Sequence, residues 1–293
     1  MSLLTRAMKV SASGYYAWRK RLVSPPKMRR KKLAMLVKDC YFENRRRYGT
    51  RRIRASLNKQ GIKIGRYQVR SLMRKQGLEA IRSKRFKPQT TDSKGTSASP
   101  NLLQDLNIEE SVAGKVIVGD ITYIYLRGGK FCYLAMWQDK ITRRIIGWSL
   151  MKRLEAKLVI SALRKAIRNG LIKAGAIIHS DRGSQYASNE FRQILKSHNL
   201  RQSMSRKGNC YDNAQAESFF SRLKMELIEG GIFEDINEAK TEIFSYIDGY
   251  YNRTRLHSSL NNQSPMEYEL SLMEYESNLK TKKGGKLRHF PLH

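Results

Sequence analysis

The amino-acid sequence predicts an α/β fold, in which a mixed five-stranded sheet is flanked by helices and preceded by a small all-helical domain. Three observations predict it. Apolar residues recur at helical spacing in the first third of the chain; runs of β-branched and aromatic residues follow; and strand-like and helical segments then alternate. With 293 residues, 40% of them hydrophobic, the chain is long enough for one ordinary domain plus a smaller one.

Positive charge is concentrated in the first third of the chain. The formal net charge is +32, and residues 1–100 hold 28 Lys and Arg against 4 Asp and Glu, which gives 28 − 4 = +24. A single cluster of this kind is most often a solvated surface. Over 100 residues, however, repulsion between like charges favours a polyanionic partner. The imbalance therefore indicates a nucleic-acid-binding protein.

The sequence also contains features that indicate the cellular compartment of the protein. No apolar run approaches 18 residues, and the N-terminal stretch lacks the continuous apolar segment of a signal peptide. The cysteines are odd in number and have no paired spacing, which predicts free thiols in a reducing compartment: Cys40, Cys132 and Cys210. We expect a cytoplasmic protein without a membrane partner.

Helical signals come first along the chain. Residues 28–46 place Leu33, Leu36, Val37, Cys40 and Tyr41 at helical spacing, so that one face packs and the other stays basic. After Tyr48-Gly49, Thr50 is the expected N-cap of a second helix, in which Ile53 and Leu57 share a face. A third helix carries Val69, Leu72 and Met73. Glycines that favour a left-handed conformation follow the last two helices, at Gly61 and Gly77.

Two short helices joined by a glycine-marked turn predict a helix-turn-helix, although an ordinary helical hairpin has the same pattern. Arginines on the outer faces favour the DNA-binding alternative, and our candidate contacts are Arg51, Arg52, Arg66 and Arg70. Residues 83–100 are polar and rich in Ser and Thr, which is typical of a linker. We therefore expect a DNA-binding region at 1–80, a linker at 81–110, a core with C-terminal helices at 111–270 and a basic tail at 271–293.

The core region reads as strands, then as alternating helices and strands. Residues 115–126, 130–141 and 143–151 are rich in β-branched and aromatic residues and predict a three-stranded antiparallel meander. An amphipathic helix at 155–170 follows, and further elements are expected at 176–181 (strand), 189–199 (helix), 200–205 (strand), 212–228 (helix) and about 236–252 (helix). This order predicts a ribonuclease H-like sheet, preceded by the helix-turn-helix domain.

Three acidic residues stand where this architecture can bring them together. Asp120 lies inside the first strand among apolar neighbours, where a carboxylate is costly to bury unless it is paired or binds a metal ion. Asp181 ends a short strand, at the carboxyl edge where open α/β sheets bind ligands. Glu217 lies one turn into a helix. Each acid alone is best explained as a salt bridge, cap or turn residue, but the trio suits Mg²⁺ or Mn²⁺. Two such ions, about 3.5–4 Å apart, promote in-line phosphoryl displacement.

Sequence motifs around these acids are recognisable. They are GDITYI at 119–124, HSDRGSQYAS at 179–188, SRKGNCYDNAQAESFFSRLKMEL at 205–227 and YNRTRLHSSLNNQSPMEY at 251–268, and YGTRRIRASLNKQG at 48–61 accompanies them. Together they resemble the integrase-like half (OrfB) of transposases of the insertion sequence 3 (IS3) family, which is similar to retroviral integrase catalytic cores. Thirty-five residues separate Asp181 from Glu217 (217 − 181 − 1), as in the D,D-35-E pattern of that family.

The resemblance implies a DDE-type DNA transposase, a metal-dependent polynucleotidyl transferase. Such an enzyme nicks the ends of its element to free a 3′-OH and uses this hydroxyl to attack a phosphodiester. Asp120, Asp181 and Glu217 would be the catalytic residues and would hold two Mg²⁺ or Mn²⁺ ions. Lys224, two helical turns after Glu217, corresponds to a basic residue of the family that contacts the phosphates of the transposon end, unless it is a solvated lysine. Ser221 lies on the same helix face.

The resemblance also implies binding partners, and the chain departs from the family pattern at one position. The partners are double-stranded DNA at transposon ends and target, further copies of the chain on DNA, and an upstream-frame partner or fused form, in the nucleoid of a bacterium. The family usually has a tryptophan shortly before the first aspartate, whereas this chain has Ile117, which we expect to pack. Structural roles are open for His179 and His257 beside catalytic ones, and no structural zinc is implied.

Two other functions fit parts of the sequence. A DNA-binding regulator could occupy element ends without catalysis, but the intact acidic trio argues against it. A nuclease acting on RNA–DNA hybrids shares the fold but does not need the basic helical region.

Overall fold

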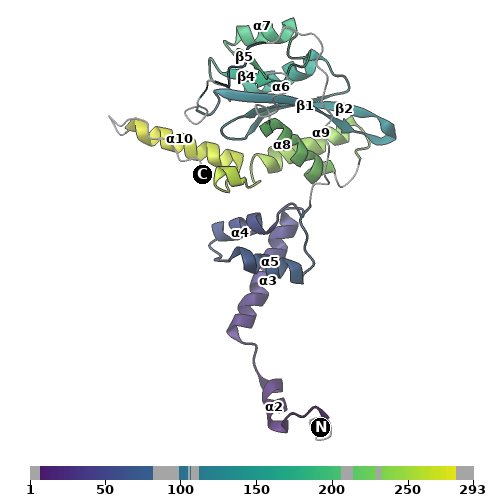
Figure 1. Cartoon of the computed structure of the whole chain (residues 1–293), viewed down its shortest axis with the longest axis vertical. Helices are drawn as coiled ribbons and strands as arrows, with labels where there is room; N and C mark the ends of the chain where they lie inside the picture. Colours follow the sequence, from purple (N-terminus) through teal and green to yellow (C-terminus); the bar gives the residue numbers. More distant parts are fainter. Residues whose placement is uncertain are drawn as a thin grey trace. The chain divides into compact units, whose positions relative to one another are not determined.

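The computed structural model describes residues 7–81, 99–104, 106, 112–205, 214–228 and 232–281 (Figure 1). The chain divides into two compact units, residues 1–81 and 82–293. Most of the expected linker, at 83–100, lies outside the described residues. In the described part of the chain, no helix is long and apolar enough to cross a membrane.

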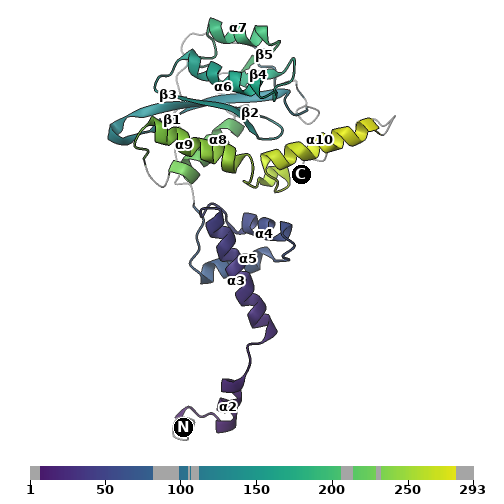
Figure 2. The ribbon, with the colours of Figure 1, turned by 180° about the vertical axis from the view of Figure 1, so that it is seen from behind.

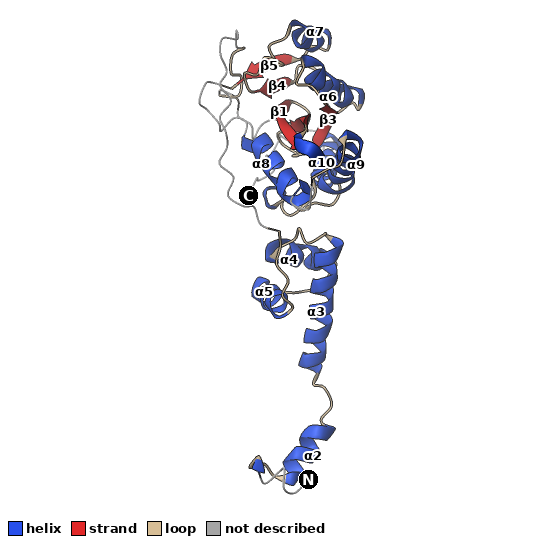
Figure 3. Ribbon diagram, turned by 90° about the vertical axis from the view of Figure 1, so that its right-hand side faces the viewer, coloured by secondary structure: helices blue, strands red, loops and turns tan. Residues whose placement is uncertain are grey.

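The first unit is helical. It comprises α2 (Ala12–Lys20), α3 (Pro25–Glu43), α4 (Thr50–Lys59) and α5 (Arg66–Lys75) (Figure 3). The last three helices pack together, and their shared core holds the residues predicted from periodicity: Leu33, Val37, Cys40, Tyr41, Ile53, Leu57, Val69, Leu72 and Met73. In contrast, no residue of α2 is buried in the described structure.

The ends of these helices confirm two predictions and correct one. Gly61 and Gly77 have φ angles of 78° and 63°, the left-handed conformation expected where α4 and α5 end. The predicted N-cap at Thr50 is wrong by one residue. Gly49 is the N-cap, with extended backbone and no side-chain hydrogen bond, and Thr50 is the first helical residue.

The second unit is built on a five-stranded mixed sheet. Its strands are β1 (Val116–Tyr125), β2 (Phe131–Asp139), β3 (Ile145–Met151), β4 (Ile177–Ser180) and β5 (Arg201–Met204). Their order in the sheet is β3-β2-β1-β4-β5. The first three strands form the antiparallel meander, while β4 pairs with β1 and β5 pairs with β4 in parallel. This is the predicted ribonuclease H-like sheet.

Helices cover both faces of this sheet (Figures 1 and 2). On one face, α6 (Ala156–Arg168) and α7 (Asn189–Ser197) enclose a core centred on Trp137. On the other face, α8 (Ala214–Leu223) and α9 (Ile236–Phe244) enclose a second core that includes Met136 and Phe219. Alternating residues of β1 and β2 supply the two cores, because successive strand side chains point to opposite faces.

The two helices that cover the second face of the sheet become π-helical before they end. The helix α8 continues as a π-helical segment at Lys224–Ile228 (η3), and α9 continues as one at Ser245–Tyr251 (η4). The remaining elements are the 3-10 turns η2 (Arg127–Gly129) and η5 (Ser258–Leu260) and the helix α10 (Pro265–Thr281). The helix predicted at about 236–252 is therefore present, but only its first half is α-helical.

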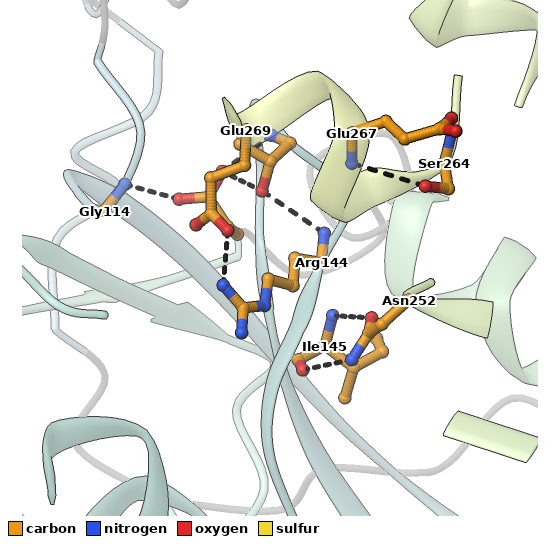
Figure 4. A network of polar contacts seen from close by, with 9 residues as sticks. Gly114, Arg144, Ile145, Asn252, Ser264, Glu267 and Glu269 are labelled. Carbon is orange, nitrogen blue, oxygen red and sulfur yellow. Dashed lines mark hydrogen bonds and ion pairs between the residues drawn. The ribbon is translucent and has the colours of Figure 1, made fainter. Parts of the chain in front are cut away.

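The segment after α9 is tied to the turn between β2 and β3 (Figure 4). The amide of Asn252 hydrogen-bonds both backbone groups of Ile145, at 2.9 and 3.0 Å, and Arg144 forms an ion pair with Glu269 of α10. The predicted start of a separate tail at residue 271 falls inside α10, which runs on to Thr281. No glycine or proline interrupts residues 266–281, which is consistent with a continuous helix through residue 271.

Candidate active site

Strand register brings Asp120 and Asp181 together. The parallel strands β1 and β4 pair Val118 with His179. Two residues further along each strand, the same register sets Asp120 beside Asp181, which directly follows β4. Both residues therefore lie at the carboxyl end of β4, the edge where open α/β sheets bind their ligands.

Asp120 belongs to the face of the sheet that α8 covers. It pairs across the sheet with Met136, which packs in the same core as Phe219 and Phe220 of α8. Its neighbour Gly119 pairs instead with Trp137, in the core of the opposite face. The alternation of strand side chains thus directs the Asp120 carboxylate towards the helix that carries Glu217.

The electrostatics of Asp120 show which charged groups surround it. Burial, followed by the negative charge of Asp181, raises the pKa of Asp120 to about 8. The charge of Glu217 raises this pKa too, whereas a hydrogen bond from the backbone N–H of Ile121 and the charge of Lys224 lower it. One partly buried carboxyl group therefore experiences both other acids of the trio and one cation.

Asp181 is held by the turn that follows β4. The backbone N–H of Gly183 donates to its Oδ1 at 3.0 Å, and burial raises the pKa of the Asp181 carboxyl. A Cβ atom at Gly183 would stand only 3.1 Å from that oxygen and 2.9 Å from Oε1 of Gln185. Any other residue here would require the Gln185 side chain to move and would crowd the Asp181 carboxylate.

Glu217 lies in the first turn of α8, and its side chain is exposed. Its charge acts on Asp120, so it stands on the side of α8 near the aspartates. No three His, Cys, Asp or Glu side chains within the described ranges form a cluster close enough to hold a metal ion. The structure therefore brings Asp120 and Asp181 together and sets Glu217 near them, but not within one ligating cluster.

Lys224 lies two helical turns after Glu217, at the point where α8 becomes π-helical. Its ammonium group stands 4.2 Å from the centre of the Tyr123 ring, a cation–π contact with β1. Burial lowers the pKa of Lys224, while the nearby Asp120 raises it. Ser221 is exposed on α8.

Comparison with known proteins agrees with this geometry. The chain matches the Integrase core domain family over residues 110–210 and 217–272, and an HTH-like domain family over residues 28–86. It is 40% identical over 247 residues to the transposase for insertion sequence element IS904 of Lactococcus lactis, covering 84% of this chain and 96% of the relative. It is 37% identical over 268 residues to the transposase InsF for insertion sequence IS3A of Escherichia coli, covering 91% and 92%. The chain belongs to the IS3 family of transposases.

Membership makes this transposase a DNA strand-transfer enzyme, and neither a silent regulator nor an RNA–DNA hybrid nuclease is favoured. Among solved structures, the catalytic core domain of HTLV-2 integrase in complex with magnesium aligns with 54% of this chain and 97% of its own. Its TM-score is 0.42 and its sequence identity 17%.

The two histidines of the transposase motifs have structural surroundings. The ring of His179 is buried, with Nδ1 2.9 Å from the hydroxyl of Ser203 and Nε2 3.0 Å from that of Ser205. These contacts tie β4 to the end of β5. His257 packs edge-on against Tyr251, with ring centres 5.0 Å apart. Ile117, which stands where the family usually has tryptophan, is buried in the core beside Trp137 as expected.

The arginines singled out in the helical unit of the transposase are accessible. Arg51, Arg66 and Arg70 are exposed on α4 and α5, and Arg52 is half-buried, with its guanidinium 5.7 Å from the ring centre of Tyr48. Their positions are compatible with a contact to DNA.

Tyr186, which lies near the aspartates, was not predicted from the sequence. Tyr186 is buried, and its ring packs edge-on against Trp137 with centres 5.7 Å apart. Burial, together with the charges of Asp181 and Asp120, raises its pKa well above the ordinary value, so its hydroxyl faces the same charges. This hydroxyl has no hydrogen-bond partner among the described residues. A tyrosine in the motif HSDRGSQYAS was visible in the sequence, but nothing there indicated that its hydroxyl is buried.

Proposed function

We propose that this transposase carries out metal-dependent nicking of element ends and strand transfer, with Asp120, Asp181 and Glu217 holding two Mg²⁺ or Mn²⁺ ions. The observation that supports the proposal most directly is the position of Asp120. It stands beside Asp181 at the carboxyl edge of β4, and it is subject to the charge of Glu217. In this proposal, Glu217 turns in from α8 to join the two aspartates at this edge.

The chemistry of these residues fits hard cations. Like charges at short distance oppose ionisation, and a divalent cation relieves that opposition. Asp139 is a buried acid outside this group. Its carboxylate accepts hydrogen bonds from the backbone N–H groups of Gly114, Ile141 and Thr142, at 2.5, 2.9 and 2.7 Å. Within the described structure Asp120 accepts one backbone bond, at 2.8 Å, which leaves carboxylate oxygens for a metal ion.

The reaction that follows is a phosphoryl displacement. The 3′-oxygen of a transposon end forms a bond to phosphorus in the target, the target's own P–O3′ bond breaks, and a target 3′-OH is released. Bound divalent ions supply Lewis-acid activation of the attacking and leaving oxygens. The chain's own contribution is to fix the carboxylates on rigid strands and, through Lys224, to hold a phosphate of the transposon end.

Further DNA contacts and partners belong to the proposal. Ser221 and Lys224 would contact the transposon end, and Arg51, Arg52, Arg66 and Arg70 would contact duplex phosphates. Two ends must be held together, so we propose that the chain multimerises on DNA, with further copies or with an upstream-frame partner or fused form. Light scattering with and without DNA tests this. A stable multimer that selects element ends in the absence of any partner would contradict it.

The proposed catalytic trio is tested by nicking and strand transfer on a supercoiled plasmid that carries the element's ends. The changes Asp120→Asn, Asp181→Asn and Glu217→Gln are each expected to lower activity at least 1,000-fold, about 4 kcal/mol in transition-state stabilisation, with DNA binding retained. Removal of divalent ions with a chelator should have the same effect on the unmodified chain.

Two matched controls come from the same unit. Glu190 is also an acid in the first turn of a helix, α7, and Glu190→Gln should leave activity unchanged. Asp139→Asn tests a buried acid outside the proposed site. It should lower stability because backbone donors lose their acceptor, while the residual activity keeps its dependence on divalent ions. A trio variant with near-normal activity would remove that residue from the site.

A further inference from the structure

A buried ion pair lies two residues from Lys224. Arg255 donates from Nη2 to Oε1 of Glu226 at 2.5 Å and from Nε to Oε2 at 3.1 Å, a bidentate arrangement. The side chains of Arg255 and Glu226 are 0% and 1% exposed. The hydroxyl of Tyr246 also donates to Oε2, at 2.9 Å. We call Glu226, Arg255 and Tyr246 together the Glu226 clamp.

The clamp joins the two π-helical segments. Glu226 lies in η3, which extends α8, and Tyr246 lies in η4, which extends α9. π-Helical segments are rare, and they are frequently found at functional sites. Here both helices widen where the buried carboxylate and the tyrosine hydroxyl meet, so the clamp and the two distortions belong to one arrangement.

The clamp is also connected to the catalytic sheet. The guanidinium of Arg255 stands 5.7 Å from the ring centre of Tyr251. Tyr251 packs edge-on against Phe219 of α8, with centres 4.9 Å apart, and its hydroxyl accepts a hydrogen bond from Gln138 of β2 at 3.1 Å. Gln138 pairs with Val118, two residues before Asp120 on β1. A continuous set of contacts therefore runs from the sheet beside Asp120 to η3.

Lys224 is the first residue of η3. Its long, flexible side chain determines the position of its charge only if the backbone beneath it is fixed. The clamp anchors that backbone two residues away, and the Lys224 ammonium lies against Tyr123 of β1. Any slip of η3 would move this cation away from Asp120 and the edge of β4.

Stability alone is a poor reason to keep such a clamp. Two charges removed from water lose solvation energy that their mutual attraction barely recovers, and apolar residues of the same volume often stabilise a fold more. In some proteins, buried polar or ionic groups are retained because they specify one geometry over its competitors. In this structure, the specified geometry is a π-helical turn that begins with a proposed DNA contact.

We propose that Glu226, held by Arg255 and Tyr246, is a positioning residue that sets the π-helical turn of Lys224 and thereby places its ammonium group on a phosphate of the DNA end. The inference rests on the proposed contact between Lys224 and DNA. Glu226 itself is buried, so in this proposal it acts only through Lys224.

The test is a double-mutant cycle in the full-length chain, with Lys224→Ala, Glu226→Gln and the double variant. Strand transfer is measured on a duplex copied from the DNA that flanks this chain's coding sequence, and binding to the same duplex is measured as a function of salt concentration. Lys224→Ala should lower the log–log salt slope of binding by about 0.9, the loss of one phosphate contact. Glu226→Gln should lower it by the same amount and slow strand transfer roughly 10- to 100-fold. The double variant should be no worse than Lys224→Ala.

Two further variants separate positioning from simple destabilisation. Tyr246→Phe removes one hydrogen bond to Glu226 and keeps the ring, so it should fold and show the same effects in milder form. Glu269→Gln breaks the ion pair with Arg144 (Figure 4), which is also largely buried but lies outside the clamp. It should lower thermal stability without changing the salt slope.

The possible failures are distinguishable. If Glu226→Gln slows transfer by the same factor with and without Lys224, and leaves the salt slope unchanged, the clamp serves stability only and the inference is overturned. If Lys224→Ala changes neither transfer nor slope, the DNA contact of Lys224 is wrong and the positioning role fails with it. The catalytic role of the acids is judged separately, by Asp120→Asn, whose activity loss does not depend on either result.

Discussion

At Asp120, burial and neighbouring charge make the ionised carboxylate unfavourable. The pKa rises from the ordinary value of 3.8 to about 8 in the folded chain. Between these two values the folded protein binds more protons at this group than the unfolded chain does. Stability therefore falls as pH rises from about 4 to about 8, and the loss is complete above pH 8.

The corresponding prediction concerns Asp120→Asn in the presence of a chelator. The substitution should raise the free energy of unfolding by about 1–3 kcal/mol above pH 8, with no gain below pH 4, because the neutral amide has no ionised form to penalise. Urea unfolding at a series of pH values measures this difference. A variant that is less stable than the unmodified chain at every pH would show that the carboxylate is stabilised in place, contrary to this account.

The sequence predicts the positions of some of these residues but not of others. The proximity of Asp120 and Asp181 was predictable, because a mid-strand acid and an acid that ends a neighbouring parallel strand can meet at one sheet edge. The exposure of Glu217 was not, since helix position alone does not tell which rotamer a side chain adopts. Glu226 looked like any helix glutamate, because its partner Arg255 lies 29 residues away.

Among the elements, strand β1 requires a residue without a side chain at Gly119. A Cβ atom at Gly119 would lie 2.3 Å from the ring of Trp137. That ring is fixed: its Nε1 donates to the carbonyl of Val159 at 3.1 Å, and it stacks on Phe191 with centres 5.8 Å apart. Neither ring nor strand can give way without disturbing Asp120, the next residue.

We therefore expect Gly119→Ala to lower the free energy of unfolding by about 1–3 kcal/mol through overpacking, and to reduce strand transfer further than the loss of folded protein explains. Gly249→Ala is the matched control, because an added Cβ there meets nothing within 4 Å. Thermal unfolding and strand transfer, measured for both variants, test this prediction. Normal activity of a folded Gly119→Ala chain would mean that this part of β1 tolerates displacement.

Whether a segment is a helix or a strand was predictable where the apolar periodicity is strong. The exact helical geometry, α or π, was not predictable. Helical spacing located α8 and α9, but the spacing of apolar residues does not distinguish an α-turn from a π-turn over five to seven residues. The basic tail expected from residue 271 overlaps α10, because basic composition does not end a helix and no glycine or proline stands between Pro265 and Thr281.

For the molecule as a whole, positive charge is concentrated in the first hundred residues, which carry +24 of the formal net charge of +32. The basic excess of residues 1–100 predicts that DNA is bound mainly through phosphates, so binding should weaken steeply with salt. Arg66→Ala combined with Arg70→Ala should lower the log–log salt slope by about 1.8, two phosphate contacts. Lys196→Ala, an exposed change on α7, should leave the slope unchanged. A salt-insensitive affinity of the unmodified chain would refute a phosphate-based mode of binding.

The central claim is that Asp120, Asp181 and Glu217 form one metal site on DNA. Anomalous diffraction from a crystal of the chain with Mn²⁺ and a DNA end tests it most directly. We expect manganese at the carboxyl edge of β4, ligated by both aspartates, with Glu217 turned in from solvent to complete the site and Lys224 on a phosphate of the same DNA. Manganese bound elsewhere, or a DNA end seated at this edge with Glu217 still directed into solvent, would contradict it.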